Sequence, residues 1–486
     1  MITSNELDRL QPESVFRFFR IISQIPRGSA NTEKIAEYCL DFAQERNLRS
    51  ARDTYGNVVI YSDGTDGYEN CEPIILQAHL DMVCEKDPQS AVNMKTDSIK
   101  LCCDGKYMWA DGTTLGGDDG IGVTYILALL DSNDIPHPPI EALFTADEEI
   151  GLLGACNLDP SLLSGRRLIN IDSEKEGILT VSCAGGVRAF VTFPLVFSKE
   201  TFEKCCVEIT LEDFAGGHSG VDIDKNHKNA LKVLAQILEE ISMDAEYRIC
   251  SLAGGSRENI IPKQASAVIC FEKKYSESVL NAIQNFNIKI RTECALSEPD
   301  GYIKAVPCNF PDKMYDKDST EKIVFSLLHV PDGIIAMSPD MPGMVQSSLN
   351  LGCASAENEI LKFGLLIRSN TSEGKRLVVH KLTSFSQYLG GKTKLAADYP
   401  EWEYRADSPL RDIMKNVYKD IYNEEPQVSG IHAGLECGIL SGKINDADMV
   451  SFGPDIENVH TTSERMNIES VQRCWEYLKA VLKKLK

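Results

Sequence analysis

The sequence predicts an α/β protein in which an α/β/α domain with a mixed, largely parallel sheet is interrupted by an inserted α+β domain. Three apolar segments, near residues 74–78, 140–146 and 167–171, each run into histidine or acidic residues, and helical patterns lie between them. Such runs are typical of buried parallel strands in α/β folds. β-type stretches then dominate residues 187–396. We therefore expect one domain from residues 1–186 and 397–486, and an insert at 187–396.

Composition narrows the classes of protein that the chain can represent. Its 486 residues suffice for two or three domains, and 43% of them are hydrophobic. A formal net charge of -22 would repel nucleic acid and anionic membranes, so we expect neither as a partner. We see no secretory leader and no apolar run near the roughly 20 residues of a membrane span. The 16 cysteines include no Cys-x-x-Cys pair. We expect a soluble, cytoplasmic protein without disulfides.

The first part of the chain predicts two helices and two short strands. Apolar residues recur at helical spacing in 12–25 and 31–47, and Asn31 suits the N-cap of the second helix. Short strands are expected at 48–53 and 57–61. These elements lead into the apolar run that begins at residue 74.

The apolar run at Ile74 predicts a buried strand that ends near His79 and Asp81. Side chains two residues apart in a strand face the same side. Ligands of open α/β sheets gather at the carboxyl ends of strands. A lone His-x-Asp is more often incidental than functional, so one wall of a metal site is a hypothesis that needs further ligands.

A glycine-rich segment carries Asp118 and Asp119 just before an apolar helix at 123–130. A phosphate loop is one alternative, but no Gly-Lys-Ser/Thr follows and two aspartates would repel phosphate. A carboxylate in a glycine-rich turn suits a cation better. A tight turn whose aspartate caps the helix is an equally good interpretation of this segment alone.

Acidic residues follow two more apolar strands. Asp147, Glu148 and Glu149 come after the strand at 140–146, and Asp172 ends the strand at 167–171. Successive carboxylates repel one another unless a cation is near. Because the same pattern occurs at three strand ends, the sequence favours a metal site.

The insert predicts alternating strands and helices. Strands are expected at 187–193, 207–211 and 266–271, with helices at 230–243 and 276–295. A second similar set comprises 323–328, a strand-like segment at 361–368 and a helix at 372–389. Two copies of one β-α-β unit are conceivable, but the internal sequence similarity is too faint to establish a repeat.

The α/β pattern resumes in the last part of the chain. A helix is expected at 409–422, with strands at 427–431 and 448–453. The final helix, at 468–485, has an apolar stripe that indicates core packing. His460 lies in the segment between the last strand and this helix.

Taken together, these motifs resemble those of the co-catalytic zinc exopeptidases. The set comprises His79-Leu80-Asp81, the loop 116–120, Asp147-Glu148-Glu149, Asp172, Gly216-Gly217-His218-Ser219-Gly220 and Asn458-Val459-His460-Thr461. The strings at 111–116 and 432–438 look like the branch of aminoacyl-histidine dipeptidases (Xaa-His dipeptidases, carnosinase-like). The chain departs from the family pattern at Gly117, Asp119 and His227, and none of these is an expected ligand.

The resemblance implies a centre with two divalent metal ions, zinc first, with manganese or cobalt able to use similar ligands. Asp118 would bridge the two ions. His79 and Asp172 would complete one site, and Glu149 and His460 the other. Glu148 would be the general base, and Asp81 would orient the ring of His79.

The resemblance also assigns roles in the insert, which would act as a lid. His218 would stabilise the oxyanion, although a histidine beside glycines is by itself more often a turn residue. Asn259, Arg368 and Gly434 are weaker candidates for substrate binding. Of these, Arg368 would hold the terminal carboxylate of the substrate by a bidentate pair, and a structural ion pair is nearly as good an interpretation.

We therefore expect a metal-dependent dipeptidase that hydrolyses short unblocked peptides, such as β-alanyl-histidine. An aminotripeptidase or related amide hydrolase is the alternative within the enzymes. A non-catalytic peptide- or metal-binding protein is the alternative outside them. The expected partners are a small peptide substrate and, through the insert, a second copy of the chain.

Overall fold

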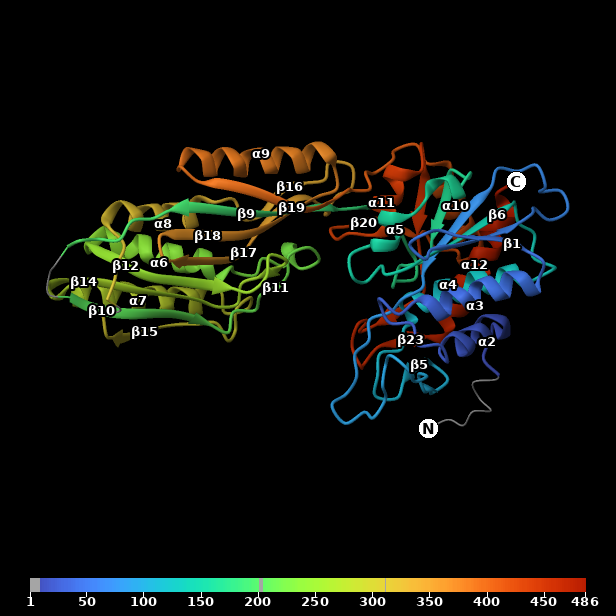
Figure 1. Ribbon diagram of the computed structural model, residues 1–486, viewed down its shortest axis with the longest axis horizontal. Coiled ribbons are helices and arrows are strands. Elements are labelled where there is room, and N and C mark those ends of the chain that lie inside the picture. The colour runs from blue at the N-terminus through green and yellow to red at the C-terminus, as the bar shows by residue number, and fades with distance from the viewer. Residues whose placement is uncertain (1–8, 201–203, 311) are drawn as a thin grey trace. The chain divides into compact units, whose positions relative to one another are not determined.

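The computed structural model describes residues 9–200, 204–310 and 312–486, which form two compact units (Figure 1). The first unit comprises Met1–Cys183, Trp402–Gly430 and Leu435–Lys486, and the second comprises Ala184–Glu401 and Ile431–Gly434. The short segment Ile431–Gly434 belongs to the second unit. The N–H of Ala184 donates to its carbonyls at Ile431 and Ala433, at 3.1 and 3.0 Å.

An eight-stranded mixed sheet forms the centre of the first unit, in the order β1-β2-β6-β3-β7-β21-β8-β20. Neighbours from β6 to β21 are parallel, whereas β1, β2 and β8 pair antiparallel. The predicted α/β class with a largely parallel sheet is confirmed. The strands are β1 (Arg49–Arg52), β2 (Val58–Ser62), β3 (Ile74–His79), β6 (Ile140–Thr145), β7 (Arg167–Asn170), β8 (Ile178–Cys183), β20 (Gln427–Ile431) and β21 (Asp448–Ser451).

The central strands β3 and β6 are rich in apolar residues and fully buried. Every residue of β3 and β6 is buried, and α4 packs directly on β3. A small four-stranded sheet, β22-β23-β5-β4, completes the unit. Its strands are β4 (Leu101–Cys103), β5 (Tyr107–Ala110), β22 (Ile456–Glu457) and β23 (Arg465–Asn467).

Five helices of the first unit correspond to predicted apolar patterns, and the two short helices α5 and α11 were not predicted. The helices are α2 (Glu13–Ile22), α3 (Glu33–Glu45), α4 (Gly117–Leu130), α5 (Leu153–Asn157), α10 (Pro409–Tyr422), α11 (Glu436–Lys443) and α12 (Ile468–Lys484). The predicted cap at Asn31 is wrong, since Thr32 is the N-cap of α3. Asn31 Nδ2 instead donates to the Lys95 carbonyl at 3.2 Å, a tertiary contact that a local sequence rule cannot detect.

The second unit is built on one antiparallel sheet, in the order β15-β10-β14-β12-β17-β18-β9-β19, with β16 paired to β17. The order shows two copies of a β-α-β-β-α-β unit, joined where β12 pairs with β17. One copy is β10-α6-β12-β14-α7-β15. The other is β9, which precedes the first copy in the chain, followed by α8, β17, β18, α9 and β19. The repeat that the sequence left open is therefore present in the topology.

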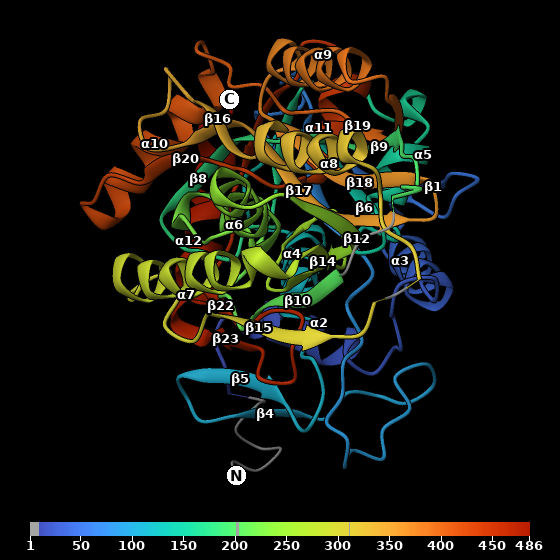
Figure 2. The same cartoon turned by 90° about the vertical axis from the view of Figure 1, so that its left-hand side faces the viewer.

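Four helices share a single apolar core with this sheet, and Figure 2 shows α6 beside α7 and α8. The segment 323–328 lies within α8. The helices are α6 (Ala230–Asp244), α7 (Ser276–Glu293), α8 (Lys317–His329) and α9 (Ser372–Tyr388). The strands are β9 (Gly185–Pro194), β10 (Lys204–Glu212), β12 (Tyr247–Gly255), β14 (Ala265–Glu272), β15 (Tyr302–Cys308), β16 (Gly333–Met337), β17 (Val345–Glu357), β18 (Ile360–Ser369) and β19 (Lys392–Tyr399), with the small pair β11 (Gly217–His218) and β13 (Ile260–Ile261).

The expectation that the chain has no disulfide is wrong. Cys206 and Cys270 are joined, with their Cα atoms 4.4 Å apart. They are direct partners in the register of β10 and β14. Strand pairing brings together cysteines 64 positions apart, and cysteines that far apart have no spacing motif that would predict their pairing.

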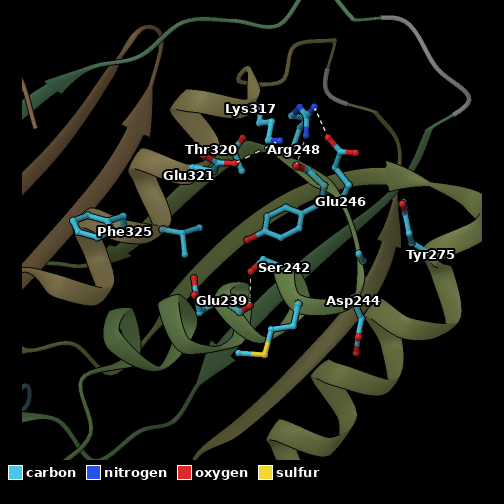
Figure 3. A pocket seen from close by; sticks show the side chains of 14 residues that line it. Glu239, Ser242, Asp244, Glu246, Arg248, Tyr275, Lys317, Thr320, Glu321 and Phe325 are labelled. Carbon is cyan, nitrogen blue, oxygen red and sulfur yellow. Dashed lines mark hydrogen bonds and ion pairs between the residues drawn. The ribbon is translucent and has the colours of Figure 1, made fainter.

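A hollow of about 570 Å³ lies in the second unit between the end of α6 and the start of α8 (Figure 3). Arg248 lines it and pairs with Glu200 and Glu246, at 3.0 and 3.1 Å. None of the residues predicted for the site lines this hollow.

Across the part of the chain that the structure describes, no helix is long and apolar enough to span a membrane.

Candidate metal centre

Two histidine–carboxylate groups share Asp118 in the first unit. His79 Nε2 lies 3.0 Å from Asp118 Oδ1 and 3.6 Å from Asp172 Oδ1. His460 Nε2 lies 3.1 Å from Asp118 Oδ2 and 3.0 Å from Glu149 Oε1. Each oxygen of Asp118 therefore faces a different histidine. The structure brings together all five side chains that were predicted as ligands.

Parallel strand pairing explains why residues distant in the sequence meet here. His79 ends β3 and is level with Thr145 at the end of β6. Gln77 is level with Asn170, the last residue of β7. The acids that follow β6 and β7 consequently emerge at the same edge of the sheet as His79.

The loop that carries Asp118 is held by a buried carboxylate, Glu464. Its oxygens accept hydrogen bonds from the N–H groups of Leu115, Gly116 and Gly117, at 2.8, 3.1 and 2.7 Å. Asp118 itself has non-helical dihedral angles, φ -81° and ψ 114°, although it lies at the start of α4. The carboxylate of Glu464 thus fixes a backbone that a regular helix start would not give.

Arg27 ties this loop to the end of β3. Its guanidinium is buried and donates to the carbonyls of Leu80 and Asp81, at 3.0 and 2.9 Å, and to the carbonyl of Gly116. Gly116 has φ 67°, and a Cβ there would come within 2.6 Å of the Arg27 guanidinium. The sequence analysis missed Arg27 and Glu464, because nothing local distinguishes either of them from an ordinary charged residue.

Asp81 lies behind His79 and not among the ligand atoms. Its Oδ1 is 3.4 Å from His79 Nδ1, the ring nitrogen that faces away from Asp118. Asp81 also accepts hydrogen bonds from the N–H groups of Glu148 and Glu149, at 2.9 and 3.2 Å. One carboxylate therefore contacts the His79 ring and also fixes the loop that carries Glu148 and Glu149.

The charges at the centre are strongly coupled. Burial alone would lower the pKa of His79, but hydrogen bonds to Asp118 and Asp172 outweigh it and hold this pKa well above its ordinary value. Hydrogen bonds to Asp118 and Glu149 raise the pKa of His460 to about 11. Burial raises the pKa of Asp172 to about 6. The surrounding carboxylates thus favour positive charge at the positions that the two imidazole nitrogens face.

Three more acids surround the ligand atoms. Glu148 groups with His79 and Glu149, with one ligand atom of each within 4.8 Å of the others. Burial first, and then the charge of Asp118, raise the pKa of Glu174 to about 7, and the sequence analysis gave this residue no role. Asp119 accepts hydrogen bonds from the N–H groups of His79 and Gly122, both at 3.1 Å, and so braces the loop.

This donor set fits two divalent cations. The groups His79–Asp118–Asp172 and Asp118–Glu149–His460 each place three ligand atoms within 4.8 Å of one another. Imidazole nitrogens with carboxylate oxygens are typical ligands of catalytic zinc. Buried carboxylates this close need positive charge between them, and two cations sharing Asp118 would supply it.

The second unit brings His218 and Arg368 together. His218 Nδ1 accepts hydrogen bonds from the N–H groups of Gly220 and Val221, both at 3.3 Å, which places the ring proton on Nε2 in the neutral form. That Nε2 lies 3.2 Å from Arg368 Nη2, which is also a donor. Two adjacent donors suit an oxyanion or a carboxylate that lies beside both of them.

The other two predicted substrate residues also lie in the second unit. The Asn259 carbonyl accepts a hydrogen bond from the N–H of Ser219 at 3.0 Å, and it thereby supports the segment of His218. A Cβ at Gly434 would lie 3.0 Å from the ring of Tyr399, whose hydroxyl accepts a hydrogen bond from Arg368. Their roles in substrate binding stay predictions.

Comparisons with known proteins agree on one family. Residues 75–484 match peptidase family M20/M25/M40. The cytosol non-specific dipeptidase of Escherichia coli (strain K12) is 34% identical over 485 residues, which cover 99% of each chain. The solved structure of aminoacylhistidine dipeptidase from Vibrio alginolyticus has a TM-score of 0.92 and 33% identity, with 98% of each chain covered. Aminopeptidase PepT from Bacillus cereus, at 16% identity and a TM-score of 0.56 over 98% of this chain and 99% of its own, shares the fold. The chain belongs to peptidase family M20/M25/M40.

Proposed function

We propose that the chain is a metal-dependent dipeptidase that hydrolyses short unblocked peptides, with Xaa-His dipeptides such as β-alanyl-histidine among its substrates. The observation that carries this proposal is the Asp118 carboxylate, shared between two histidine–carboxylate groups with Glu148 beside them. The names of the Escherichia coli and Vibrio alginolyticus relatives support the substrate class.

His79, Asp118 and Asp172 would hold one divalent ion, and Asp118, Glu149 and His460 the other. Zinc is the proposed metal, and manganese and cobalt accept the same ligand types. When bound, such a pair supplies Lewis acidity at the peptide carbonyl and makes water more acidic. Asp81 keeps the Nε2 atom of His79 directed at the centre.

Glu148 accepts the proton of the attacking water on its carboxylate and then delivers it to the leaving amine. His218 and Arg368 contribute the paired donors of the second unit. The ring N–H of His218 stabilises the oxyanion, and the guanidinium of Arg368 holds the terminal carboxylate of the substrate.

Glu148→Ala tests the mechanism. We expect cleavage of β-alanyl-histidine to be abolished by a chelator and restored by zinc in the wild type. We expect the variant to be nearly inactive while it retains its metal, as measured by elemental analysis. Glu37→Ala, an exposed acid on α3, is the control. Full activity of Glu148→Ala would contradict the proposed role.

An aminotripeptidase or related amide hydrolase is the second candidate, and a panel of di- and tripeptides separates the two. Hydrolysis confined to tripeptides would replace the dipeptidase proposal. A non-catalytic binding protein is disfavoured because Glu148 and the complete ligand set are present and grouped.

We also propose that the chain acts in the cytoplasm and forms a homodimer through the second unit. The name of the Escherichia coli relative supports the location. The sheet of the second unit ends in β15 and β19, whose outer edges pair with no other described strand. Light scattering should give twice the chain mass of 53.8 kDa, and a mass of one chain would overturn the dimer.

A further inference from the structure

A cavity of about 880 Å³ lies beside the metal centre, within the first unit. Four short segments line it, and one of them contains Glu149, a proposed metal ligand. The cavity therefore begins where the reaction would take place. The segments are 28–31, 82–86, 91–95 and 149–150.

Apolar and sulfur-containing side chains make up half of the residues that line the cavity. Met82 is buried, and Ile150 is 51% exposed beside the centre. Several polar side chains of the lining are already engaged. Asn31 Nδ2 donates to the Lys95 carbonyl at 3.2 Å, and Lys86 Nζ donates to the carbonyls of Ser90 and Val92, at 3.2 and 2.9 Å. The remaining apolar lining comprises Ala30, Val83, Cys84, Ala91, Val92 and Met94.

The walls of the cavity are attached to the centre. Ser29 Oγ donates to Asp81 Oδ2 at 2.7 Å, and the N–H of Ala30 donates to Asp147 Oδ1 at 2.6 Å. The N–H of Met82 donates to the carbonyl of Arg27 at 3.1 Å. The position of the cavity relative to the reacting groups is thus fixed, as a specificity pocket requires.

The acids of the cavity that lie nearest the metal centre suit one end of a peptide better than the other. Two acids, Glu85 and Glu149, and two lysines, Lys86 and Lys95, line the cavity, and Asp147 contacts its wall as a third acid in the loop of the metal centre. Carboxylates attract the ammonium group of an unblocked peptide and repel its terminal carboxylate. The facing donors His218 and Arg368 suit that carboxylate instead.

We propose that this cavity binds the side chain of the amino-terminal residue of the substrate and selects large apolar side chains, such as leucine and methionine. The inference rests on the proposed dipeptidase function and adds its substrate preference. Glycine and β-alanine, which offer no side chain to fill the cavity, would make poorer substrates than leucine at this position. One apolar pocket of this kind discriminates by about tenfold or more.

The first test compares kcat/KM for Leu-His and Gly-His with zinc present. We expect the wild type to prefer Leu-His at least tenfold. Val92→Trp, which fills the cavity, should lower this ratio at least tenfold. Ile21→Trp, a partly exposed position on α2 outside the cavity, is the matched control and should keep the wild-type ratio.

A reversible modification covers the case in which Val92→Trp fails to fold. Benzyl methanethiosulfonate attaches a benzylthio group to the Cys84 sulfur as a mixed disulfide and releases methanesulfinate, and dithiothreitol removes the group again. We expect the reagent to lower the Leu-His to Gly-His ratio and dithiothreitol to restore it. Cys84→Ser should abolish the response. Cys156→Ser, which removes another exposed thiol outside the cavity, should keep it.

The outcomes separate this inference from the function on which it rests. Equal rates for Leu-His and Gly-His, unchanged by either form of filling, would overturn the pocket and leave the dipeptidase intact. If filling the cavity instead lowers the ratio of kcat/KM for Gly-Leu to kcat/KM for Gly-Gly, the cavity binds the carboxy-terminal side chain, and the assignment to the amino-terminal residue is wrong. If no dipeptide is cleaved with any divalent metal, both proposals fail.

Discussion

Two buried charged residues outside the ligand set, Arg27 and Glu464, hold the backbone on which Asp118 depends. Arg27 donates to the carbonyls of Leu80, Asp81 and Gly116. Glu464 accepts hydrogen bonds from three successive N–H groups of the loop that carries Asp118. They act through other residues and are positioning residues. Loss of such support commonly reduces metal affinity or activity by about 10- to 100-fold.

Arg27→Met tests this support. We expect kcat/KM to fall by about 10- to 100-fold and zinc affinity to fall with it, because three carbonyls lose their donor and the Asp118 loop shifts. Competition with a chromogenic chelator measures the affinity. Arg52→Met, which removes a partly exposed ion pair with Glu33, is the control. Unchanged zinc affinity in Arg27→Met would show that the loop holds its shape without the guanidinium.

His432 is a buried histidine that should stay neutral. Its Nε2 lies 2.8 Å from Ser348 Oγ and its Nδ1 lies 3.1 Å from Asn370 Oδ1. Burial first, and then the charge of Arg368, lower its pKa to about 3. In the unfolded chain this imidazole takes up a proton near pH 6.5. Protonation then favours the unfolded state, so the free energy of unfolding is highest above that pH and decreases as the pH falls toward 3.

His432→Gln should remove this pH dependence. Between pH 8 and pH 5 the metal-free wild type should lose about 2 kcal/mol more unfolding free energy than the variant, as measured by urea unfolding. Glutamine can keep both hydrogen bonds without titrating. His329→Gln, at an exposed position of α8, should behave like the wild type. Parallel pH profiles for the wild type and His432→Gln would contradict the lowered pKa.

At the scale of single elements, apolar periodicity located most helices within a few residues. The stripe of α12 is the plainest case, with Val471, Leu478 and Val481 fully buried. The helix extends from Ile468 to Lys484, against an expected 468–485. The two agree because burial of one face of the helix requires apolar residues at helical spacing, and the same burial stabilises the helix.

Leu478→Ala should therefore be costly. Removal of a fully buried leucine side chain lowers the unfolding free energy by about 2–5 kcal/mol, and Tm in the metal-free protein should fall accordingly. Lys484→Ala, at an exposed position of the same helix, should change it by less than about 0.5 kcal/mol. Similar melting curves for both variants would mean that α12 contributes little to the core.

At the scale of the whole molecule, the first unit gathers many carboxylates at one edge of its sheet. Asp118, Glu149 and Asp172 lie close to two histidines, with Glu148 and Glu174 next to them. Mutual repulsion of these acids opposes folding unless cations are bound. Metal binding should consequently stabilise this unit by mass action.

Chelation tests this coupling. We expect Tm to fall on addition of a chelator and to rise again with zinc, with about 4 kcal/mol of stabilisation at a free zinc concentration 1,000 times Kd. Differential scanning calorimetry measures the shift. Asp118→Asn should lose most of the response, since Asp118 belongs to both groups. An equal response in that variant would place the metal elsewhere.

The sequence by itself determined the strand–acid pattern and the α/β class, because apolar periodicity and residue chemistry are local properties, and the resemblance of its motifs to a known family supplied the ligand candidates. Strand registers place His79, Asp118 and Asp172 together, and no single segment contains that information. Only the tertiary structure revealed Arg27 and Glu464, the pairing of Cys206 with Cys270, and the doubled topology of the second unit. Each of these depends on contacts between residues far apart in the chain, and the free energy that fixes them comes from packing whole elements together.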